Sequence, residues 1–410
     1  MATADIDAPL PLARVLAAIG GVYVAQSLVG GLTFMGVPAV LRAEGASLAE
    51  IGLVSLLMLP WALKFLWAPL AERYRIRPDG ARRSRRLVAA GQIACALLLG
   101  AVALVGPDGG QALFGLLALV ALASATVDIA VDAFAVERLA DANRGWGNVA
   151  QVGGGYLGMV LGGGAFLVLV PAVGWTGATG AMACLVLLLA VPFLSGAEPP
   201  LPAPATPHRP SLLYALRRPE VRLGLLVTVL FEAGVRLVQV LSGPFLVDRG
   251  LDLAALGFVN GGGGVAAGIA GTLIGGLLVR RCGARVALLV AAALQVLALL
   301  ALTAGAAAEA GAELLAGLVV LKTLSMAMGF VTLYSLLMGL SSLKQAGVDF
   351  TLFQCADAAT AGMAGYGAAL AAGTLGYATT FAAAAVAAGI GLVLILFILR
   401  RLAAVPEPRP

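Results

Sequence analysis

The chain has 410 residues, of which 61% are hydrophobic and only 11% are charged, and its mean hydropathy is +1.00. Soluble domains carry about 25% charged residues, so this composition excludes an ordinary water-soluble globular protein. The formal net charge of +5 would suit nucleic acid. However, the arginines lie between apolar runs and act first as topology signals, so no nucleic-acid partner is expected.

Long apolar runs recur along the chain. A helix needs about 20 predominantly apolar residues to cross a bilayer. The runs are continuous and do not alternate, which predicts helices and excludes a β-barrel. The twelve runs lie near residues 12–41, 49–71, 87–106, 111–138, 147–170, 175–194, 221–247, 252–279, 286–305, 312–341, 347–372 and 376–399. The predicted fold class is an all-α membrane protein with twelve transmembrane helices.

One polar segment interrupts the apolar pattern. Residues 195–220 are rich in proline, which predicts a linker between two six-helix bundles, residues 1–194 and 221–410. The end of the second run, APLAERYRIR at 68–77, is echoed by GLLVRRCGAR at 276–285. Duplicated bundles of this kind are typical of secondary transporters.

The basic residues are distributed unevenly among the loops. Seven arginines lie between the second and third runs, and further Arg or Lys residues follow the fourth, sixth, eighth, tenth and twelfth runs. The opposite loops hold little beyond Arg42 and Arg249. This pattern predicts that both termini and the linker face the cytoplasm. Asp5 and Asp7 stand where a signal peptide would carry positive charge, so the first run is expected to be a retained helix.

Twelve spans in two sets of six, with a basic loop after spans two and eight, resemble the major facilitator superfamily. Residues 59–74, LPWALKFLWAPLAERY, resemble one branch, which contains the muropeptide permease AmpG, the acetyl-CoA transporters and the RhtX/FptX-type siderophore permeases. The chain is shorter than usual AmpG-type proteins, and residues 330–335 and 349–354 are similar to the siderophore permeases. The resemblance implies a permease, expected to be a monomer, that imports a small-molecule iron–siderophore complex across the bacterial inner membrane. Muropeptide import is the alternative.

Several acidic residues lie at bilayer depth, where charge is costly and usually functional. Asp128 and Asp132 are four residues apart in span four, so they share one helix face. Together with Glu232 in span seven and Asp357 in span eleven, they are candidates for proton coupling. Burial raises a carboxyl group's pKa and a nearby cation lowers it, so alternating surroundings could move a proton. The alternative is a structural carboxylate bonded to a neighbouring helix.

The superfamily resemblance implies that spans one, four, seven and ten line a central cavity. The candidates for substrate binding lie on three of these spans and on span eleven: Tyr23, Gln26, Glu232, Arg236, Gln239, Lys322, Tyr334 and Gln354. Glu232 and Arg236 could form an internal salt bridge. Alternatively, Arg236 or Lys322 could attract a carboxylate of the ligand while an acidic partner carries a proton.

The resemblance also implies a cytoplasmic gate that ties the two halves through charges and a helix end. Its candidate residues follow the second span: Lys64, Glu72, Arg73, Arg82 and Arg83. Lys64 lies deeper than the others, so it could reach the cytoplasmic surface or pair with an acid from span four or eleven.

Other motifs carry less chemistry. The glycine tracts at 153–155, 162–164 and 261–264 lack the context of a nucleotide loop, so they are interpreted as sites of close helix packing. The four cysteines are scattered singly, and the lone His208 lies among prolines. No metal site, disulfide or cofactor is therefore expected.

The main alternative to a transporter is a membrane enzyme. The Asp128-xxx-Asp132 spacing resembles the Mg²⁺–diphosphate site of intramembrane prenyltransferases, which need a second acidic cluster on a facing helix. Asp349 and Asp357 are eight residues apart and make a poor second cluster. The sequence therefore predicts a transporter and not an enzyme.

Overall fold

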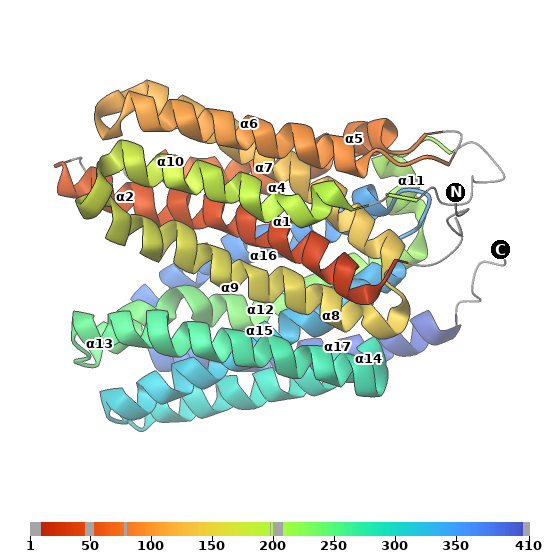
Figure 1. The fold of residues 1–410 in the computed structure, drawn as a ribbon. Helices are drawn as coiled ribbons and strands as arrows, with labels where there is room; N and C mark the ends of the chain where they lie inside the picture. Colours follow the sequence, from red (N-terminus) through yellow and green to blue (C-terminus); the bar gives the residue numbers. More distant parts are fainter. Residues whose placement is uncertain (1–9, 46–52, 78–79, 197, 200–207, 405–410) are drawn as a thin grey trace. The chain divides into compact units, whose positions relative to one another are not determined.

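The computed structural model describes residues 10–45, 53–77, 80–196, 198–199 and 208–404. The described residues form helices joined by short turns, with one isolated antiparallel bridge between Ile76 and Arg82 (Figure 1). The predicted all-α class is confirmed.

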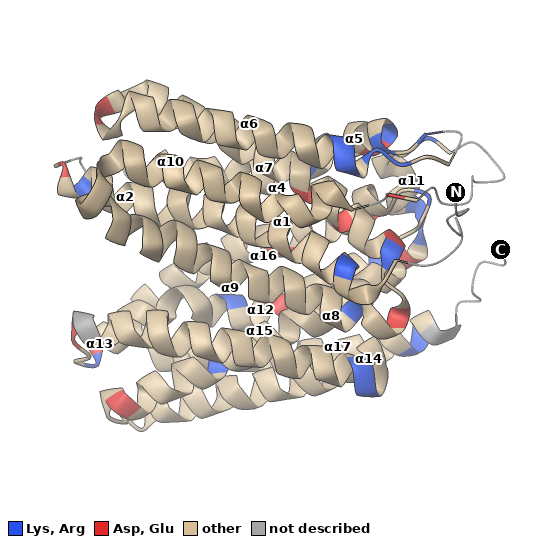
Figure 2. Ribbon diagram, in the orientation of Figure 1, with Lys and Arg blue, Asp and Glu red and all other residues tan. Residues whose placement is uncertain are grey.

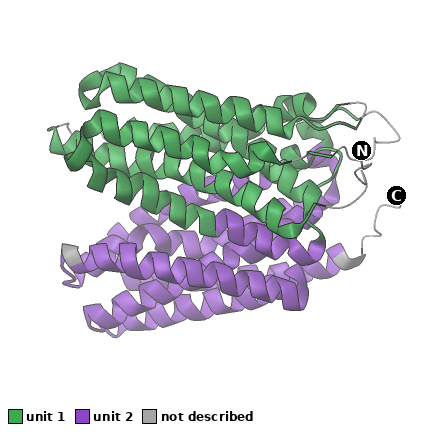
Figure 3. Ribbon diagram, viewed as in Figure 1, with its two compact units in different colours: residues 1–140, 153–214, 341–351 green, residues 141–152, 215–340, 352–410 purple. Residues whose placement is uncertain are grey.

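The chain divides into two compact units, and neither is a continuous stretch of sequence (Figure 3). Unit 1 comprises Met1–Ala140, Gly153–Tyr214 and Ser341–Thr351, and unit 2 comprises Asp141–Val152, Ala215–Leu340 and Leu352–Pro410. Each unit thus includes a short segment from the other half of the sequence. The predicted linker, residues 195–220, includes 200–207, which lie outside the described residues, so the predicted division into halves stays a prediction.

Unit 1 is built around three long helices, α1, α7 and α10, with α6 packed against α7 and α10. Its elements are α1 (Leu12–Gly31), η1 (Leu32–Gly36), α2 (Val37–Ala43), η2 (Val54–Met58), α4 (Leu59–Leu63), η3 (Lys64–Leu66), α5 (Ala68–Arg75), α6 (Ser84–Val105), η4 (Pro107–Gly109), α7 (Gly110–Arg138), α9 (Gly154–Met159), η7 (Val160–Ala165), α10 (Phe166–Ser195), the first half of α11 (Leu212–Arg217) and the first turns of α16.

Unit 2 is built around α12, α14, α15 and α17, in which α14 packs against α15 and α12 packs against α17. Its elements are η5 (Asp141–Asn143), α8 (Arg144–Asn148), most of η6 (Val149–Gly153), α12 (Pro219–Asp248), α13 (Leu253–Phe258), η8 (Val259–Gly263), α14 (Gly264–Ala307), α15 (Ala312–Leu340), the larger part of α16 (Ala346–Leu375) and α17 (Tyr377–Ala404).

Two of the long helices are each broken by a glycine with positive φ. Gly174 in α10 has φ 73°, and Gly283 in α14 has φ 76°. Only glycine adopts this conformation readily, so the chain turns at these points and a second helix begins. Eight described helices are long and apolar enough to cross a membrane, and η2 to α5 adds a span bent by 58°. When α10 and α14 are divided at these glycines and α16 is counted as well, the described residues contain twelve helical segments that correspond to the twelve apolar runs.

Charged residues gather at the helix ends, while the middle parts of the helices are almost free of them (Figure 2). Large apolar side chains on these middle parts are exposed, for example Leu97 (70%) and Leu297 (60%). An outer surface of this kind is stable in lipid and not in water.

Glycine allows α1 to approach η7 very closely within unit 1. A Cβ atom on Gly162 would lie 1.9 Å from the Leu28 carbonyl oxygen, so no side chain fits there. The interpretation of this tract as a packing site is confirmed at Gly162. It does not extend to Gly261, whose added Cβ would have no heavy atom within 4 Å.

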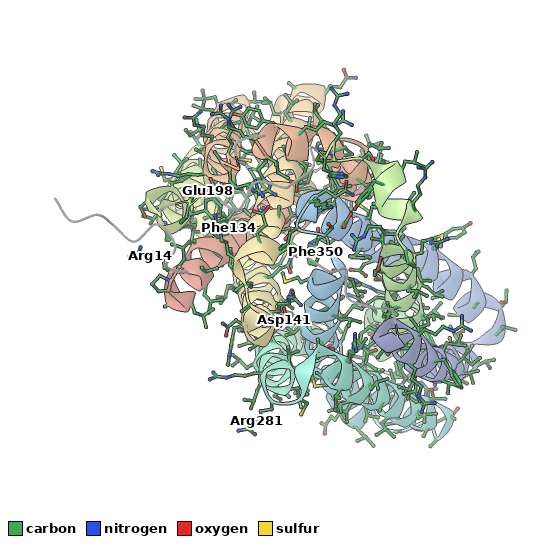
Figure 4. All side chains as sticks on the ribbon, turned by 90° about the vertical axis from the view of Figure 1, so that its right-hand side faces the viewer. Arg14, Phe134, Asp141, Glu198, Arg281 and Phe350 are labelled. Atoms are coloured by element: carbon green, nitrogen blue, oxygen red, sulfur yellow. The ribbon has the colours of Figure 1, made fainter. Side chains whose placement is uncertain are left out.

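The beginning of the predicted linker is fixed to unit 1. Glu198 accepts hydrogen bonds from the backbone N–H groups of Ser84 (3.0 Å) and Arg85 (2.9 Å), which are the first residues of α6. A carboxylate at this end satisfies unpaired N–H groups and the positive end of the helix dipole. Glu198 lies near Arg14 and Phe134 at this end of the unit, where the three residues line a small hollow (Figure 4).

Candidate functional site

The first charged group inside unit 1, here called the aspartate cluster, comprises Tyr23, Gln26, Lys64, Asp128 and Asp132. Lys64 forms an ion pair with Asp128 and lies 3.9 Å from an Asp132 oxygen. The Tyr23 hydroxyl donates to Asp132 Oδ1 at 2.7 Å. The side-chain amide of Gln26 is oriented so that both its nitrogen and its oxygen have partners. The nitrogen donates to Asp128 Oδ1 (2.8 Å), and the oxygen accepts from the Asp128 backbone N–H (3.0 Å).

Local structure places these side chains together. Asp128 and Asp132 lie one turn apart on α7, as the sequence predicted. Lys64 opens η3, the short 3₁₀ turn that comes directly before the bend into α5. The bend therefore directs the lysine inward, where only 3% of it is exposed. Two carboxylates share one ammonium group in a buried cluster, which leaves one excess negative charge if all three are ionised.

The second group, called the arginine cluster, lies in unit 2 and comprises Glu232, Arg236, Gln239, Tyr334 and Asp357. Arg236 Nη2 donates to Asp357 Oδ1 at 2.6 Å, and Arg236 Nε lies 2.9 Å from Glu232 Oε2. The Tyr334 hydroxyl donates to Asp357 Oδ2 (2.8 Å), and Arg236 Nη1 donates to Gln239 Oε1 (2.9 Å). Arg236 therefore already has two anionic partners, so the internal salt bridge considered for Glu232 and Arg236 is formed.

Two further contacts shape the arginine cluster. The guanidinium carbon of Arg236 lies 4.8 Å from the centre of the Phe330 ring, which is within cation–π distance. Although Glu232 is fully buried and close to Arg236, neither of its oxygens has a hydrogen-bonding partner among the described residues. The ion pair at 2.9 Å thus has poor hydrogen-bond geometry, and Glu232 is the less satisfied of the two carboxylates.

Lys322 on α15 is a buried cation with a different environment. It is 3% exposed, and its ammonium group donates to the Ser242 hydroxyl at 3.4 Å. Among the described residues no carboxylate lies within ion-pair distance of Lys322. A buried ammonium group without an anion is unfavourable, so this position favours an incoming negative charge.

The third group is the gate cluster, which comprises Glu72, Arg75, Arg82 and Glu137 in unit 1. Arg75 is fully buried and holds Glu72 with two hydrogen bonds (2.7 and 2.8 Å) and Glu137 with two more (2.8 and 2.7 Å). Arg82 Nε lies 3.2 Å from Glu137 Oε1. Bidentate pairs of this kind are the strongest hydrogen bonds available to side chains.

Glu72 also binds a segment from far along the sequence. Its Oε1 accepts the backbone N–H of Gly347 at 3.1 Å, in the first turn of α16. The carboxylate therefore caps that helix within unit 1. Gly347 has to be small, because an added Cβ would lie 2.7 Å from Glu72 Oε2.

The family to which this chain belongs follows from its sequence match. The profile of the Major Facilitator Superfamily matches residues 19–365, which is most of the chain. The chain belongs to the major facilitator superfamily. Superfamily membership confirms the broader resemblance noted in the sequence, and it shows a membrane protein of the transporter type.

Named relatives refine this placement. An anhydromuropeptide permease of Escherichia coli (strain K12) is 34% identical over 283 residues, which are 66% of this chain and 56% of the relative. This chain therefore matches only a little over half of that protein. A protein described as putative transporter AmpG 4 of Rickettsia conorii is 22% identical over 77% of this chain and 80% of its own length.

Solved structures show the same fold. A bacterial homologue of the iron transporter ferroportin, in an outward-facing state, superposes with a TM-score of 0.70 over 96% of this chain and 99% of its own, at 16% identity. Such low identity supports the fold alone. The relatives thus support the AmpG-type part of the predicted branch, and they give no support to the RhtX/FptX-type siderophore permeases.

The structure brings some of the predicted residues of this superfamily member together and separates others. Tyr23 and Gln26 lie with the proton candidates Asp128 and Asp132, and Asp357 lies with the substrate candidates around Arg236. Gln354 is half-buried on α16, three residues before Asp357. These roles remain predictions, since position alone does not establish transport.

The predicted gate residues divide in a similar way. Glu72 and Arg82 lie in the gate cluster, whereas Lys64 lies in the aspartate cluster, paired with an acid of span four as one reading proposed. Arg73 donates to the Pro210 carbonyl oxygen at 3.1 Å, and Arg83 lies 5.4 Å from the centre of the Tyr74 ring.

Sequence reasoning missed Arg75 and Glu137. The spacing of three residues between Glu72 and Arg75 was a usable signal, because such positions are neighbours on a helix. Six other arginines in the same loop obscured it.

A buried glutamine was also missed. Gln345 is fully buried in unit 1 and accepts the Ser211 N–H (3.0 Å), while its amide nitrogen donates to Asp349 (2.7 Å). Its Oε1 also lies 2.9 Å from Nε2 of His208. The only histidine of the chain thus has a structural position at the end of the linker. In the described residues no group of His, Cys, Asp or Glu side chains is placed to hold a metal ion.

Proposed function

We propose that this protein is a proton-coupled importer of carboxylate-bearing cell-wall fragments of the anhydromuropeptide type. The relationship to the anhydromuropeptide permease of Escherichia coli, 34% identical over 283 residues, carries the substrate class. The comparison supports the muropeptide alternative over the iron–siderophore reading that the sequence favoured. We further propose that the protein acts as a monomer in the bacterial inner membrane, with both termini in the cytoplasm and transport by alternating access.

The aspartate cluster supports the coupling step. Its two carboxylates face a single ammonium group, so addition of one proton neutralises the buried charge. Asp132 is fully buried and Asp128 is 9% exposed. We assign the proton to this aspartate pair, because both carboxyl groups lie close to the single ammonium group of Lys64.

The substrate step is supported by the cations of unit 2. Arg236 is neutralised by Asp357 and Glu232, so an arriving carboxylate would have to displace one of them. Lys322 has no such competitor among the described residues. Of the two cations considered from the sequence, Lys322 is therefore the better anchor for a substrate carboxylate, and Arg236 serves to organise its own cluster.

Iron–siderophore import is the second candidate. Its support is the resemblance of residues 330–335 and 349–354 to siderophore permeases. Carboxyl-bearing siderophores would suit the same cation, so the chemistry of Lys322 does not separate the two substrates.

Paired uptake assays distinguish the candidates. Cells that lack their own muropeptide and siderophore permeases would express this protein and receive either a labelled anhydromuropeptide or a labelled iron–siderophore complex. We expect accumulation of the muropeptide alone, abolished by a protonophore. Accumulation of the siderophore alone would overturn the substrate assignment, and muropeptide uptake that survives the protonophore would overturn the coupling.

A further inference from the structure

A groove on the outside of unit 2 has no role in the function proposed above. It lies between the beginning of α12 and the end of α17 and has a volume of about 500 Å³. Pockets that hold organic ligands usually measure roughly 300–1,000 Å³, so the groove is large enough for part of a sizeable molecule. Leu223, Leu226 and Leu230 line one wall, and Leu394 and Phe397 line the other.

The groove is apolar and open to the surroundings of the protein. Leu226 is 46% exposed and Phe397 is 54% exposed in the whole described structure. In a membrane-spanning protein the surroundings of such a surface are lipid chains. The walls therefore match the hydrocarbon part of a lipid.

One end of the groove is strongly basic. Arg400 and Arg401 form part of its lining, and both are exposed. Arg222 is exposed one turn before Leu226 on α12, so it lies on the same face of the helix as the leucine wall. None of these three arginines forms an ion pair with another residue in the described part of the chain.

We propose that this groove binds an anionic phospholipid. One acyl chain lies against the leucines of α12 and Phe397, and the phosphate contacts the arginines at the basic end. One guanidinium group can donate two parallel hydrogen bonds to a phosphate group. Basic pockets between membrane helices are suited to anionic headgroups. A free phosphate would leave the apolar walls of the groove uncovered. A zwitterionic lipid has no net charge, so it would not offset the positive charge of the three arginines.

Native mass spectrometry tests the proposal. The purified full-length protein would be released from nanodiscs that contain equal amounts of phosphatidylglycerol and phosphatidylcholine with identical acyl chains. We expect phosphatidylglycerol to be retained preferentially. The double variant Arg400→Gln/Arg401→Gln should retain about 25-fold less of it, because each basic residue near an anionic headgroup is worth ~1 kcal/mol and 1.4 kcal/mol is a factor of ten.

Two further variants separate charge from shape. Arg280→Gln/Arg281→Gln removes an exposed arginine pair from α14 and should leave retention unchanged. Leu226→Trp fills the groove but keeps its arginines, and it should lower retention of phosphatidylglycerol. Thermal melting checks that each variant is folded.

Each of the following results would overturn the proposal. The first is equal loss of phosphatidylglycerol in the α14 control, which would indicate unspecific charge attraction. The second is equal retention of both lipids by the unaltered protein. The third is full retention by the folded Leu226→Trp variant or full displacement by millimolar inorganic phosphate, either of which would show that the apolar groove does not hold the ligand.

Discussion

Replacing Arg75 with glutamine should destabilise the protein more than any other single change in the basic loop. The arginine is fully buried and donates four hydrogen bonds to Glu72 and Glu137. Its loss leaves Glu137 with Arg82 as its partner in the gate cluster, and it leaves Glu72 with the backbone N–H of Gly347. Breaking a buried ion pair by removing one partner typically costs about 3–5 kcal/mol, because a buried charge is left uncompensated.

The charge balance of the gate cluster makes this prediction sharper. Glu72, Glu137, Arg75 and Arg82 sum to zero, and Arg75→Gln leaves one excess negative charge. The double variant Glu72→Gln/Arg75→Gln restores neutrality, so it should recover part of the lost stability despite carrying one more substitution.

Unfolding of the detergent-solubilised protein, followed by circular dichroism against temperature and denaturant, measures the effect. Arg86→Gln is the control, because Arg86 is exposed in the first turn of α6 and its loss should change the unfolding free energy by less than about 0.5 kcal/mol. The reasoning would be refuted if Arg75→Gln were no less stable than this control, or if the double variant were less stable than Arg75→Gln.

Three other predictions concern transport and packing. Asp132→Asn should abolish accumulation driven by a proton gradient while substrate exchange across vesicles continues, and loss of both would argue against a coupling role. Lys322→Gln should raise the KM for a carboxylate-bearing substrate about 10- to 150-fold, since a hydrogen bond to a charged group is worth about 1.5–3 kcal/mol. The control is Lys344→Gln, which replaces an exposed lysine and should leave the KM unchanged. Gly162→Ala should lower stability by about 1–3 kcal/mol through overpacking in thermal melts, whereas Gly164→Ala, with open space at its Cβ, should not.

The fold could be predicted from the sequence because the bilayer fixes the length and polarity of each span. The twelve apolar runs correspond to helices in the described residues. This holds even at Gly174, where two helices follow each other directly across a turn. The runs also predicted the positions of both turns, since Gly174 lies between the runs 147–170 and 175–194, and Gly283 lies between the runs 252–279 and 286–305. They gave no indication that residues 341–351 belong with unit 1.

The candidate sites could be predicted only where helix spacing defines a face. Asp128 with Asp132, and Glu232 with Arg236, were paired correctly because positions four apart are neighbours. Pairings between helices, such as Lys64 with Asp128, depend on the bend at η3 and could be stated only as one of several alternatives. A single sequence carries no signal for the distance between two side chains on different helices.

Charge balance separates the structural groups of this protein from those suited to transport. The gate cluster is neutral and fully bonded, so binding a proton or an anion there would create an unpaired charge. If all their groups are ionised, the aspartate cluster has one excess negative charge, and so does the arginine cluster, in which Glu232 and Asp357 flank Arg236. Lys322 lacks an acidic partner among the described residues. A ligand shifts a conformational equilibrium only by its differential affinity for the two states. We therefore expect the proton to act at the aspartate pair and a substrate carboxylate to act at Lys322, where each would reduce the net buried charge, and we expect the gate cluster to respond to the conformational change.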